Sequence, residues 1–588
     1  MSHIISKTTN VKFSEALITP KAPSYQGIEL PWIKGNAELA PDSWKPLTER
    51  VFFVDLAKSG LQTIPCAVLQ LQDLEELHLE KNEILEIPPE IRYLKNLKIL
   101  YVNNNKINII SKEFGELTQL QSLDLSENPL TEGLPTQIVC RLQALRELRL
   151  YDMNLTELPA EICKMLLHLE LLGLSGNEFA VLPWEIISLR NLKEIYLQRN
   201  KFCLLPVYLC QLCSLEILDM GQNALEYLPD EIRSLQKLKH LYLAYNNLRA
   251  TPEALHDCIS LRVLDLTGNQ LYENKVNSLP KGIAELSVSN NQLCTIPPSI
   301  PTVASALQLL YLKNTQLKKL PSAIYCLKGL RILDLSQNRL RHFPKHICCL
   351  DKLELLSLDD SKVKEIPPEI KNLHNLKTLG LTGNRFQAFP QEICSLVSLE
   401  RLHLGQHHGM KFTGLPDAIT GLVNLKELYL ENNLIEFLPA TFGLLQSLKI
   451  LDLHENRILE IPQSICDIQG LKQLIFDCNR LTQLPENLDQ LQKLEVLSLT
   501  RNPLKEPPDD VYQQGIPAVF QYLQKKRHQR LMAIKLQSWW RGLMVRLQLG
   551  PFKDLFPKKN KKGKKEKGKK EKGKKEADKG KKQKGAKK

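Results

Sequence analysis

The sequence predicts an α/β fold built as a solenoid of repeats. First, a unit of about 23 residues recurs, with substitutions, from about Val51 to Pro508. Second, each unit opens with apolar residues at alternate positions, which is typical of a short strand. Third, the apolar residues that follow are more widely spaced, which indicates a turn and a short helix. A fixed period of this length along most of a chain predicts stacked repeats rather than separate globular domains.

The unit is clearest in Leu215–Lys237, LEILDMGQNALEYLPDEIRSLQK, whose skeleton is L-x-x-L-x-L-x-x-N-x-L-x-x-L-P-x-x-I-x-x-L. Alignment on the Asn position gives twenty repeats, from Ser59 to Asn502. This skeleton resembles the leucine-rich-repeat family over about three quarters of the residues. The resemblance implies a curved solenoid with a parallel sheet on its concave face. The Leu-Pro element on a 23-residue period resembles the intracellular, Ras-group class of these repeats.

The chemistry of two residue types explains why they recur in the skeleton, namely the asparagine and the proline. A stacked column of Asn side chains can both donate and accept, so it can satisfy backbone groups where the chain leaves the sheet. Ser59, Thr315 and Ser361 stand in this column and should do so in part, whereas Met153 cannot. The proline is predicted to start the convex helical turn, where its missing N–H costs nothing.

Two repeats break the period. The repeat of Asn269 is shortened, and its helix is expected to be replaced by a turn in YENKVNSLPKGIAEL. The repeat of His407 is lengthened by the segment GQHHGMKFTG, Gly405–Gly414, which is expected to bulge as a loop. His403, His407 and His408 lack a carboxylate or thiol at ligand spacing, so they are interpreted as solvated loop histidines rather than as a metal site.

Side chains between the two strand leucines should point to the concave side, because side chains alternate along a strand. Tyr and Asp recur in this column. The candidate partner-binding residues are Tyr101, Tyr196, Asp219, Tyr242, Asp265, Tyr311 and Tyr429. Tyr rows give rigid, amphipathic contact area and carboxylates favour a partner with Lys or Arg, which predicts a protein-binding face. The alternative is that Asp at this position is common repeat usage.

Four segments are predicted. Residues 1–50 form an N-terminal arm and solenoid cap, in which Trp32 or Trp44 is expected to cover the first strand. Residues 51–509 form the solenoid, and 510–550 form a capping helix that starts near Pro517 and closes the core with Val519 and Leu523. Residues 551–588 form a Lys-rich tail without the apolar content needed to fold.

The helix carries a second motif. Leu536, Gln537, Arg541, Gly542, Arg546 and Leu549 match [ILV]-Q-x-x-x-R-G-x-x-x-R-x-x-L, which resembles the IQ motif bound by calmodulin and calmodulin-like light chains. Leu536, Trp540, Leu543 and Leu547 make one apolar helix face that Trp539 and Met544 widen, and the nearby charges are basic. The resemblance implies that Gln537 and Arg541 contact one calmodulin lobe and Arg546 the other. The alternative is a simple cap with buried tryptophans.

The net charge of +13 comes from the C-terminus: Lys558–Lys588 holds 18 Lys and four acids, so the rest of the chain is near neutral. This tail could contact a cytoskeletal polymer, membrane lipid or nucleic acid, and charge alone does not choose among them. Cysteines at helical positions, such as Cys163, Cys326, Cys394 and Cys466, are interpreted as small buried hydrophobes. With no leader and no membrane-spanning run, they predict a reducing, cytoplasmic setting.

No catalytic signature appears, and neither a cofactor nor a metal is predicted. The solenoid and the IQ-like helix together resemble the leucine-rich-repeat and IQ-motif-containing proteins. The sequence therefore predicts a non-enzymatic adaptor in signal transduction, with a protein on the concave face and calmodulin on the helix. The alternatives are a regulator of a small GTPase or phosphatase, by fold-level analogy, and a cytoskeletal or ciliary protein that uses its basic tail. The corresponding alternative locations are the cytoskeleton, the cilium and the nucleus.

Overall fold

The computed structural model describes residues 50–130, 133–272, 275–276, 278–303, 305–407 and 411–547. The chain divides into two compact units, Met1–Phe520 and Gln521–Lys588. The expected packing of Trp32 or Trp44 and the Lys-rich tail lie outside the described residues. Within those ranges, no helix combines the length and apolarity that crossing a membrane requires.

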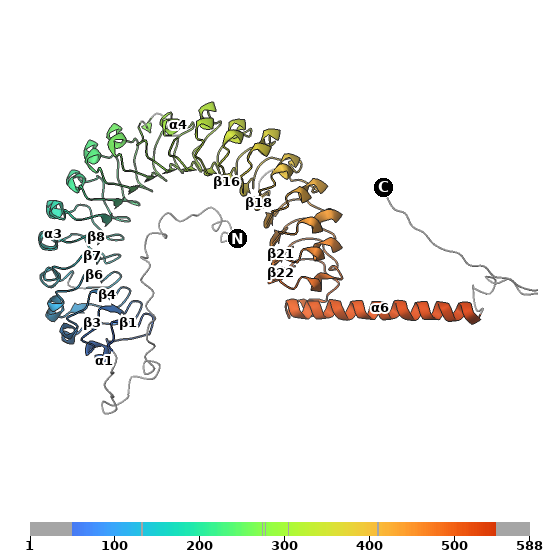
Figure 1. The fold of residues 1–588 in the computed structure, drawn as a ribbon, viewed down its shortest axis with the longest axis horizontal. Coiled ribbons are helices and arrows are strands. Elements are labelled where there is room, and N and C mark those ends of the chain that lie inside the picture. Colours follow the sequence, from blue (N-terminus) through green and yellow to red (C-terminus); the bar gives the residue numbers. More distant parts are fainter. Residues whose placement is uncertain are drawn as a thin grey trace, which may run out of the picture. The chain divides into compact units, whose positions relative to one another are not determined.

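The sheet of the first unit confirms the predicted solenoid. Strands of three residues pair in parallel with the strand before and after, so each repeat adds one strand, and Figure 1 shows them along the inner side of the arc. Among the described residues, twenty strands form this sheet. They are β1 Phe53–Asp55, β2 Glu76–His78, β4 Ile99–Tyr101, β6 Ser122–Asp124, β7 Glu147–Arg149, β8 Leu171–Gly173, β9 Glu194–Tyr196, β10 Ile217–Asp219, β11 His240–Tyr242, β12 Val263–Asp265, β13 Glu285–Ser287, β14 Leu309–Tyr311, β15 Ile332–Asp334, β16 Leu355–Ser357, β17 Thr378–Gly380, β18 Arg401–His403, β19 Glu427–Tyr429, β20 Ile450–Asp452, β21 Gln473–Ile475 and β22 Val496–Ser498. A second, two-stranded sheet pairs β3 Glu86–Ile87 with β5 Ile109–Ile110.

Short helical turns line the outer side of the arc, and most are 3-10 turns of five residues (Figure 1). These are η3 Pro89–Tyr93, η4 Lys112–Glu116, η5 Trp184–Ser188, η6 Val207–Gln211, η7 Asp230–Ser234, η8 Glu253–Asp257, η10 Ser322–Cys326, η11 Lys345–Cys349, η12 Pro368–Asn372, η13 Gln391–Ser395, η14 Asp417–Gly421, η15 Ala440–Leu444, η16 Gln463–Asp467 and η17 Leu488–Gln490. The α-helices are α1 Cys66–Leu69, α2 Thr136–Val139, α3 Ala160–Met165, α4 Ser299–Thr302, α5 Asp509–Tyr512 and α6 Ile516–Leu547.

The repeat proline plays a slightly different part from the one expected. In most repeats it precedes the turn in an extended conformation instead of occupying its first position, as Pro229 does with φ −73° and ψ 153°. Its carbonyl oxygen then accepts the N–H of Ile232 at 3.2 Å, which begins the 3-10 hydrogen bonding. The proline thus fixes the chain direction into the turn, because its ring holds φ near this value.

The core is the stack of consensus leucines. Leu218, the central residue of β10, is fully buried and pairs in register with Ile195 and Leu241 of the neighbouring strands. Each repeat buries its apolar residues only against the repeats on either side, so burial is spread along the array. Cys163 and Cys466 are buried as predicted and Cys394 is half-buried, but Cys326 is exposed. The prediction for Cys326 was wrong because it stands two residues, not one, after the buried Ile of its turn.

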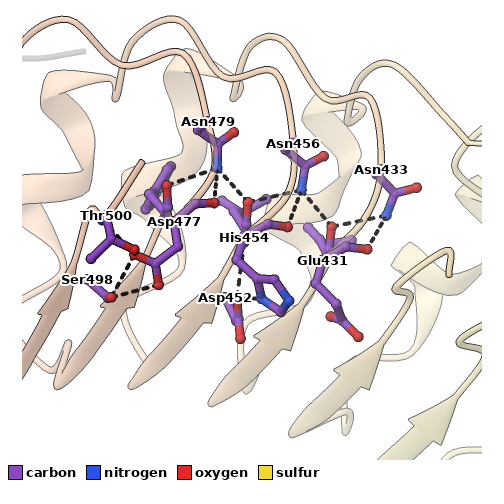
Figure 2. Close-up of polar contacts among 12 residues, drawn as sticks. Glu431, Asn433, Asp452, His454, Asn456, Asp477, Asn479, Ser498 and Thr500 are labelled. Carbon is purple, nitrogen blue, oxygen red and sulfur yellow. Dashed lines mark hydrogen bonds and ion pairs between the residues drawn. The ribbon is translucent and has the colours of Figure 1, made fainter. Parts of the chain in front are cut away.

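The asparagine column forms the predicted ladder of hydrogen bonds. Figure 2 shows Asn433, Asn456 and Asn479 donating to backbone carbonyl groups. Asn456 Nδ2 donates to Leu430 O of the preceding repeat and to Leu453 O of its own, both within 3.0 Å. Its Oδ1 accepts the N–H of Ile435 at 3.0 Å. Each asparagine therefore ties two neighbouring repeats together at the point where the chain leaves the sheet.

The substituted positions of the ladder differ. Thr315 donates its hydroxyl to Leu312 O at 2.7 Å, as predicted for a partial substitute. Ser361 does not fulfil that prediction, because its buried Oγ has no partner among the described residues. Met153 contributes only its backbone N–H, which Asn177 Oδ1 accepts at 3.0 Å.

Both irregular repeats were identified correctly as breaks. A turn at Lys281–Gly282 stands where the helical turn of the shortened repeat would be. In the lengthened repeat, Gln406 is fully buried, and neither atom of its amide has a hydrogen-bond partner among the described residues. The side-chain oxygen of Asn433 also has no hydrogen-bond partner among the described residues. Its Nδ2 still donates to Leu404 O of the preceding repeat at 3.1 Å, so the extra residues remove only the accepting half of the ladder contact.

The last strand of the sheet is capped by side chains from beyond the repeats. Tyr512 Oη accepts the N–H of Leu499 at 2.9 Å and donates to Leu497 O at 3.4 Å. Val519 is fully buried, as predicted for a residue that closes the core. Pro517 stands at the second position of α6, which agrees with its predicted place at a helix start.

Candidate functional site

The parallel register places part of the predicted concave column side by side. Asp219 pairs with Tyr196 on one side and Tyr242 on the other, and Tyr242 pairs in turn with Asp265. These four residues therefore occupy adjacent strands, β9 to β12. Tyr311 follows after one intervening residue, Ser287 of β13. Tyr101 on β4 and Tyr429 on β19 lie in other parts of the same column.

The aspartates of this column hold the backbone of their own repeat. Asp219 Oδ1 accepts the N–H of Gly221 at 2.9 Å, and Asp265 Oδ1 accepts that of Thr267 at 2.9 Å. Both side chains are buried. The same contact recurs at Asp124, Asp334 and Asp452. These hydrogen bonds explain why Asp recurs at this position without a binding partner. They support the alternative that Asp here is common repeat usage.

The tyrosines contact neighbours on the sheet surface. Tyr101 is half-buried, and its ring lies 4.9 Å from that of His78 and 6.0 Å from the Arg149 guanidinium. Tyr196 donates its hydroxyl to Glu194 at 2.8 Å. Tyr429 stacks on His403 with ring centroids 4.5 Å apart. These contacts orient the rings, so the sheet presents them as fixed groups rather than as mobile side chains.

Several concave carboxyl groups carry raised pKa values. Burial, together with nearby Asp265, raises the pKa of Asp219 to about 6 and that of Glu285 to about 7. Burial likewise raises the pKa of Asp359 on the same surface to about 7. Among the described residues, no Lys or Arg forms an ion pair with Asp219, Asp265 or Glu285. The centre of the concave face therefore has carboxyl groups that a cationic partner would stabilise in their charged form.

His403 and His407 are not solvated loop residues, contrary to the prediction, and His408 lies outside the described residues. His403 lies on β18 against Tyr429, and burial lowers its pKa. His407 Nε2 lies 3.5 Å from Glu431 Oε1. Glu431 comes from the next repeat, so the partner is 24 residues away in sequence and close only in the stacked array. Figure 2 shows Glu431 in the same row as His454, which contacts Asp452 at 2.7 Å.

Contacts with these carboxylates raise the pKa values of His407 and His454. Sequence spacing within one repeat could not show the contact between His407 and Glu431, because it joins two repeats, whereas His454 and Asp452 stand two residues apart in one repeat. Among the residues described, no group of three His, Cys, Asp or Glu side chains is placed to hold a metal ion.

The IQ-like residues lie on the distal half of the single helix α6. Leu536, Trp539 and Trp540 are exposed, with 65%, 58% and 55% of their surface accessible. Arg541 and Arg546 are exposed and Gly542 is half-buried, while Gln537 is exposed. Leu549 lies outside the described residues. Both tryptophans are therefore accessible on the surface of α6.

The apolar face extends one turn further than the sequence pattern suggested. Met532 stands four residues before Leu536 and is 48% exposed, and residues four apart lie on the same side of a helix. Leu531 and Ile534 are also exposed, but the helical period places them away from this face. Met532 could have been found by extending the i, i+4 pattern backwards from the motif.

Two family models match the repeats. One, described as a leucine-rich repeat region, matches residues 328–432 and 416–541. The other, described as a leucine rich repeat, matches residues 72–130, 211–271 and 281–340. With the parallel sheet and the asparagine ladder, these matches show that the chain belongs to the leucine-rich-repeat proteins.

Within that class, the resemblance to the leucine-rich-repeat and IQ-motif-containing proteins is confirmed. The chain is 57% identical over 166 residues to "Leucine-rich repeat and IQ domain-containing protein 4" of Mus musculus, and 52% identical over 166 residues to the Homo sapiens protein of that name. Each alignment covers 28% of this chain, and 28% and 30% of the relatives. The chain thus spans less than a third of each relative's length.

Solved structures share the fold. A plant peptide hormone receptor, RGFR1 in complex with RGF2, is 28% identical with a TM-score of 0.51, over 78% of this chain and 75% of the receptor chain. The ectodomain of the Arabidopsis thaliana receptor kinase GASSHO1/SCHENGEN3, in complex with CASPARIAN STRIP INTEGRITY FACTOR 2, is 28% identical with a TM-score of 0.54. That match covers 77% of this chain and 59% of the ectodomain chain.

Proposed function

We propose that the protein is a non-enzymatic adaptor that binds calmodulin or a calmodulin-like light chain on α6 while its concave face holds a protein partner. The motif from Leu536 to Leu549 is the site for calmodulin. The IQ domain in the names of the relatives supports this assignment.

One observation carries the proposal: α6 exposes Leu536, Trp539 and Trp540 together. Large apolar groups gathered on one exposed helix face are a liability unless a partner covers them. The basic residues Lys535, Arg541 and Arg546 stand beside this face, and Val511–Lys553 contains no acid. An acidic partner that grips amphipathic helices satisfies both the apolar and the charged requirement.

The test is a pull-down of the full chain with calmodulin, with and without calcium. Binding is expected in at least one condition, and Trp540→Ala with Arg541→Ala should abolish it. Leu531→Ala with Ile534→Ala is the matched control, because these apolar side chains are exposed on the same helix away from the motif face. Absence of binding in both conditions, or equal binding by both double variants, would contradict the proposal.

For the concave face we propose a partner that presents Lys or Arg. The carboxyl groups of Asp219, Asp265 and Glu285 form no ion pair with Lys or Arg among the described residues, which supports this charge preference. The row from Tyr196 to Tyr311 offers rigid contact area. The two plant receptors are described in complex with RGF2 and CASPARIAN STRIP INTEGRITY FACTOR 2, which supports a ligand-binding role for a repeat array. Affinity capture with the wild-type chain and with two variants tests this part. Tyr242→Ala should lose the captured partner, whereas Leu204→Ala, which lies outside the column, should retain it.

We also place the protein in the cytoplasm. All fourteen cysteines are free, including exposed ones such as Cys203, Cys213 and Cys349. Unpaired, exposed thiols suit a reducing compartment better than an oxidising one. Imaging of a tagged full chain tests this assignment, and a purely secreted protein would contradict it.

A further inference from the structure

A strip of basic side chains crosses four consecutive repeats outside the concave face. In each repeat it lies in the segment between the position of the asparagine ladder and the Leu-Pro element. Its members share an exposed position on this segment. They are Lys318, Lys319, Arg339, Arg341, Lys362, Lys364 and Arg385. This local excess of cations is hidden in the composition, because the repeat region as a whole is slightly acidic.

Backbone hydrogen bonds place these residues next to one another. Arg339 N donates to Leu317 O at 2.8 Å, so Arg339 lies beside Lys318 of the preceding repeat. Lys362 N donates to Leu340 O at 3.0 Å, which places Lys362 beside Arg339 and Arg341. The same step repeats when Arg385 N donates to Val363 O at 2.8 Å, next to Lys364. The strip is therefore continuous across the four repeats.

The strip is not neutralised by neighbouring acids. Among the described residues, none of its seven members forms an ion pair, whereas the corresponding positions of earlier repeats do so. Lys106 pairs with Glu83 at 3.2 Å, and Lys201 pairs with Glu178 at 3.0 Å. Like charges placed side by side repel each other, so an anionic partner would relieve this repulsion as well as gain contacts.

The strip is narrow, which limits the shape of the partner. Within one repeat it spans about four residues, or on the order of 10 Å. Exposed carboxylates border it: Asp360 stands on the concave side and Glu365 on the side of the helical turn, where Glu369 also approaches Lys345 at 3.8 Å. A single extended chain fits between these borders. A nucleic-acid duplex is wider than its major groove of about 12 Å, so it is wider than the strip and would place phosphates over the acids as well.

The side chains exclude two other anionic surfaces as the preferred partner. Base stacking on single-stranded nucleic acid needs aromatic platforms, and the strip positions hold no Phe, Tyr or Trp. Insertion into a lipid surface needs exposed apolar residues between the cations, and the apolar residues here, such as Leu340 and Val363, are fully buried. Carboxylates of an extended polypeptide remain, and Arg339, Arg341 and Arg385 can bind them with two parallel hydrogen bonds.

We propose that the strip from Lys318 to Arg385 binds an extended, Asp- or Glu-rich polypeptide segment that runs across the repeats. This site is separate from the concave face and from α6. It would give the adaptor a third contact surface, directed at an acidic segment rather than at a basic partner.

The test measures binding of fluorescent polyglutamate to the full chain by anisotropy. The Lys-rich tail also attracts polyglutamate, so two variants that both keep the tail are compared. Arg341→Glu with Lys364→Glu reverses two charges in the strip, and Arg457→Glu with Arg480→Glu reverses two exposed charges on later repeats. The strip variant should bind polyglutamate about tenfold more weakly than the control variant, because each exposed ion pair contributes up to about 1 kcal/mol and two of them are lost.

Carbodiimide coupling identifies the contacting lysines directly. Coupling of bound polyglutamate should give adducts at Lys318, Lys319, Lys362 or Lys364, and circular dichroism of both variants should match that of the wild-type protein. Equal affinity of the two folded variants, or adducts confined to the tail, would overturn the proposal. A 20-base-pair DNA duplex and vesicles containing phosphatidylserine are tested as competing ligands. The proposal would also be overturned if either one displaced polyglutamate from the wild-type protein and its own affinity fell more in the strip variant than the affinity of polyglutamate did.

Discussion

The concave face and helix α6 both display suggestive side chains, but they use them differently. On the sheet, Asp219 and Asp265 are buried and hold backbone N–H groups of their own repeats. On α6, Trp539 and Trp540 are exposed, with more than half of their surface accessible. The aspartates are thus accounted for by the architecture, whereas the tryptophans are not.

This difference shows where a repeat protein reveals its function. A residue type that recurs with the period can serve the repeat, a partner or both, because every copy has the same local environment. An exposed residue outside the period, such as Trp539 or Trp540, has no such structural explanation. Substitutions should therefore separate the two sets of residues: at the leucines and aspartates of the repeat consensus they should change stability, and at the exposed tryptophans of α6 they should change binding.

The largest effect is expected for a charge in the leucine stack. Leu218→Asp places a carboxylate at a fully buried position and should lower the free energy of unfolding of the adjoining repeats by about 4 kcal/mol. Hydrogen exchange measured by mass spectrometry should show lost protection around β9 to β11, with β2 and β21 unaffected. Calmodulin binding should not change.

Leu204→Asp is the matched control, since Leu204 is 46% exposed and should tolerate the charge. Uniform loss of protection along the whole array in Leu218→Asp would contradict the view that each repeat depends only on its neighbours.

The next largest effect is expected on α6. Trp540→Ala should weaken calmodulin binding by about 2 kcal/mol, or about thirtyfold, because a large aromatic anchor is removed. Its thermal unfolding should match that of the wild-type protein, since the side chain is exposed. Ile534→Ala, 52% exposed on the same helix, should bind normally. If Trp540→Ala lowered the thermal stability and left calmodulin binding unchanged, Trp540 would be a structural residue, contrary to the comparison with the aspartates.

A smaller effect is expected for the column aspartate. Asp219→Ala removes the acceptor of the Gly221 N–H and should cost about 1 kcal/mol of stability. Asp219→Asn keeps a side-chain oxygen and should restore most of it. Urea denaturation at pH 4 measures the difference without the cost of a buried charge, because burial raises the pKa of Asp219 to about 6 and the folded chain then holds it protonated. If both variants were as stable as the wild-type protein and lost only partner binding, the aspartates would be functional rather than structural.

A pH dependence is expected at Glu285. Its pKa in the folded chain, about 7, lies above the ordinary value of 4.5, so the folded state holds more protons than the unfolded state between these values. Stability from this group is therefore lost as the pH rises from about 4.5 to about 7. Glu285→Gln should have the higher urea midpoint at pH 8, and the gain should vanish at pH 4.

Glu427→Gln provides the contrast for this prediction. Glu427 stands at the equivalent position of β19 but pairs with Arg401 at 3.1 Å, so its removal should not stabilise the fold. A stabilisation of the same size at both positions would show that the gain does not come from the unpaired charge of Glu285.

Most of the fold could be predicted because each consensus residue has one task. The alternation around Leu218 defines a strand, Asn456 ties two repeats, and Pro229 directs the turn, so the period alone gives the strand count and the register. The sequence did not show that the turns are 3-10 turns, because five residues between fixed ends do not distinguish i to i+3 from i to i+4 bonding. It also did not show the exposure of Cys326, which depends on its place within the turn.

The candidate sites were predicted less completely, because their residues are far apart in the sequence. His407 contacts Glu431 and Lys362 lies beside Arg341 only because repeats stack, so contacts of this kind join residues 20 or more positions apart. Reading one column at a time found Asp219 and Tyr242 but missed the basic strip, which crosses several columns. Met532 was missed because the motif was taken to begin at Leu536.

The most direct test of the central claim is hydrogen exchange of the full chain with and without calmodulin, in the presence and absence of calcium. The account predicts new protection within Met532–Leu547 of α6 in at least one condition, with exchange in strands β1 to β22 unchanged. New protection in the strands with none in α6, or no protection anywhere in either condition, would contradict it.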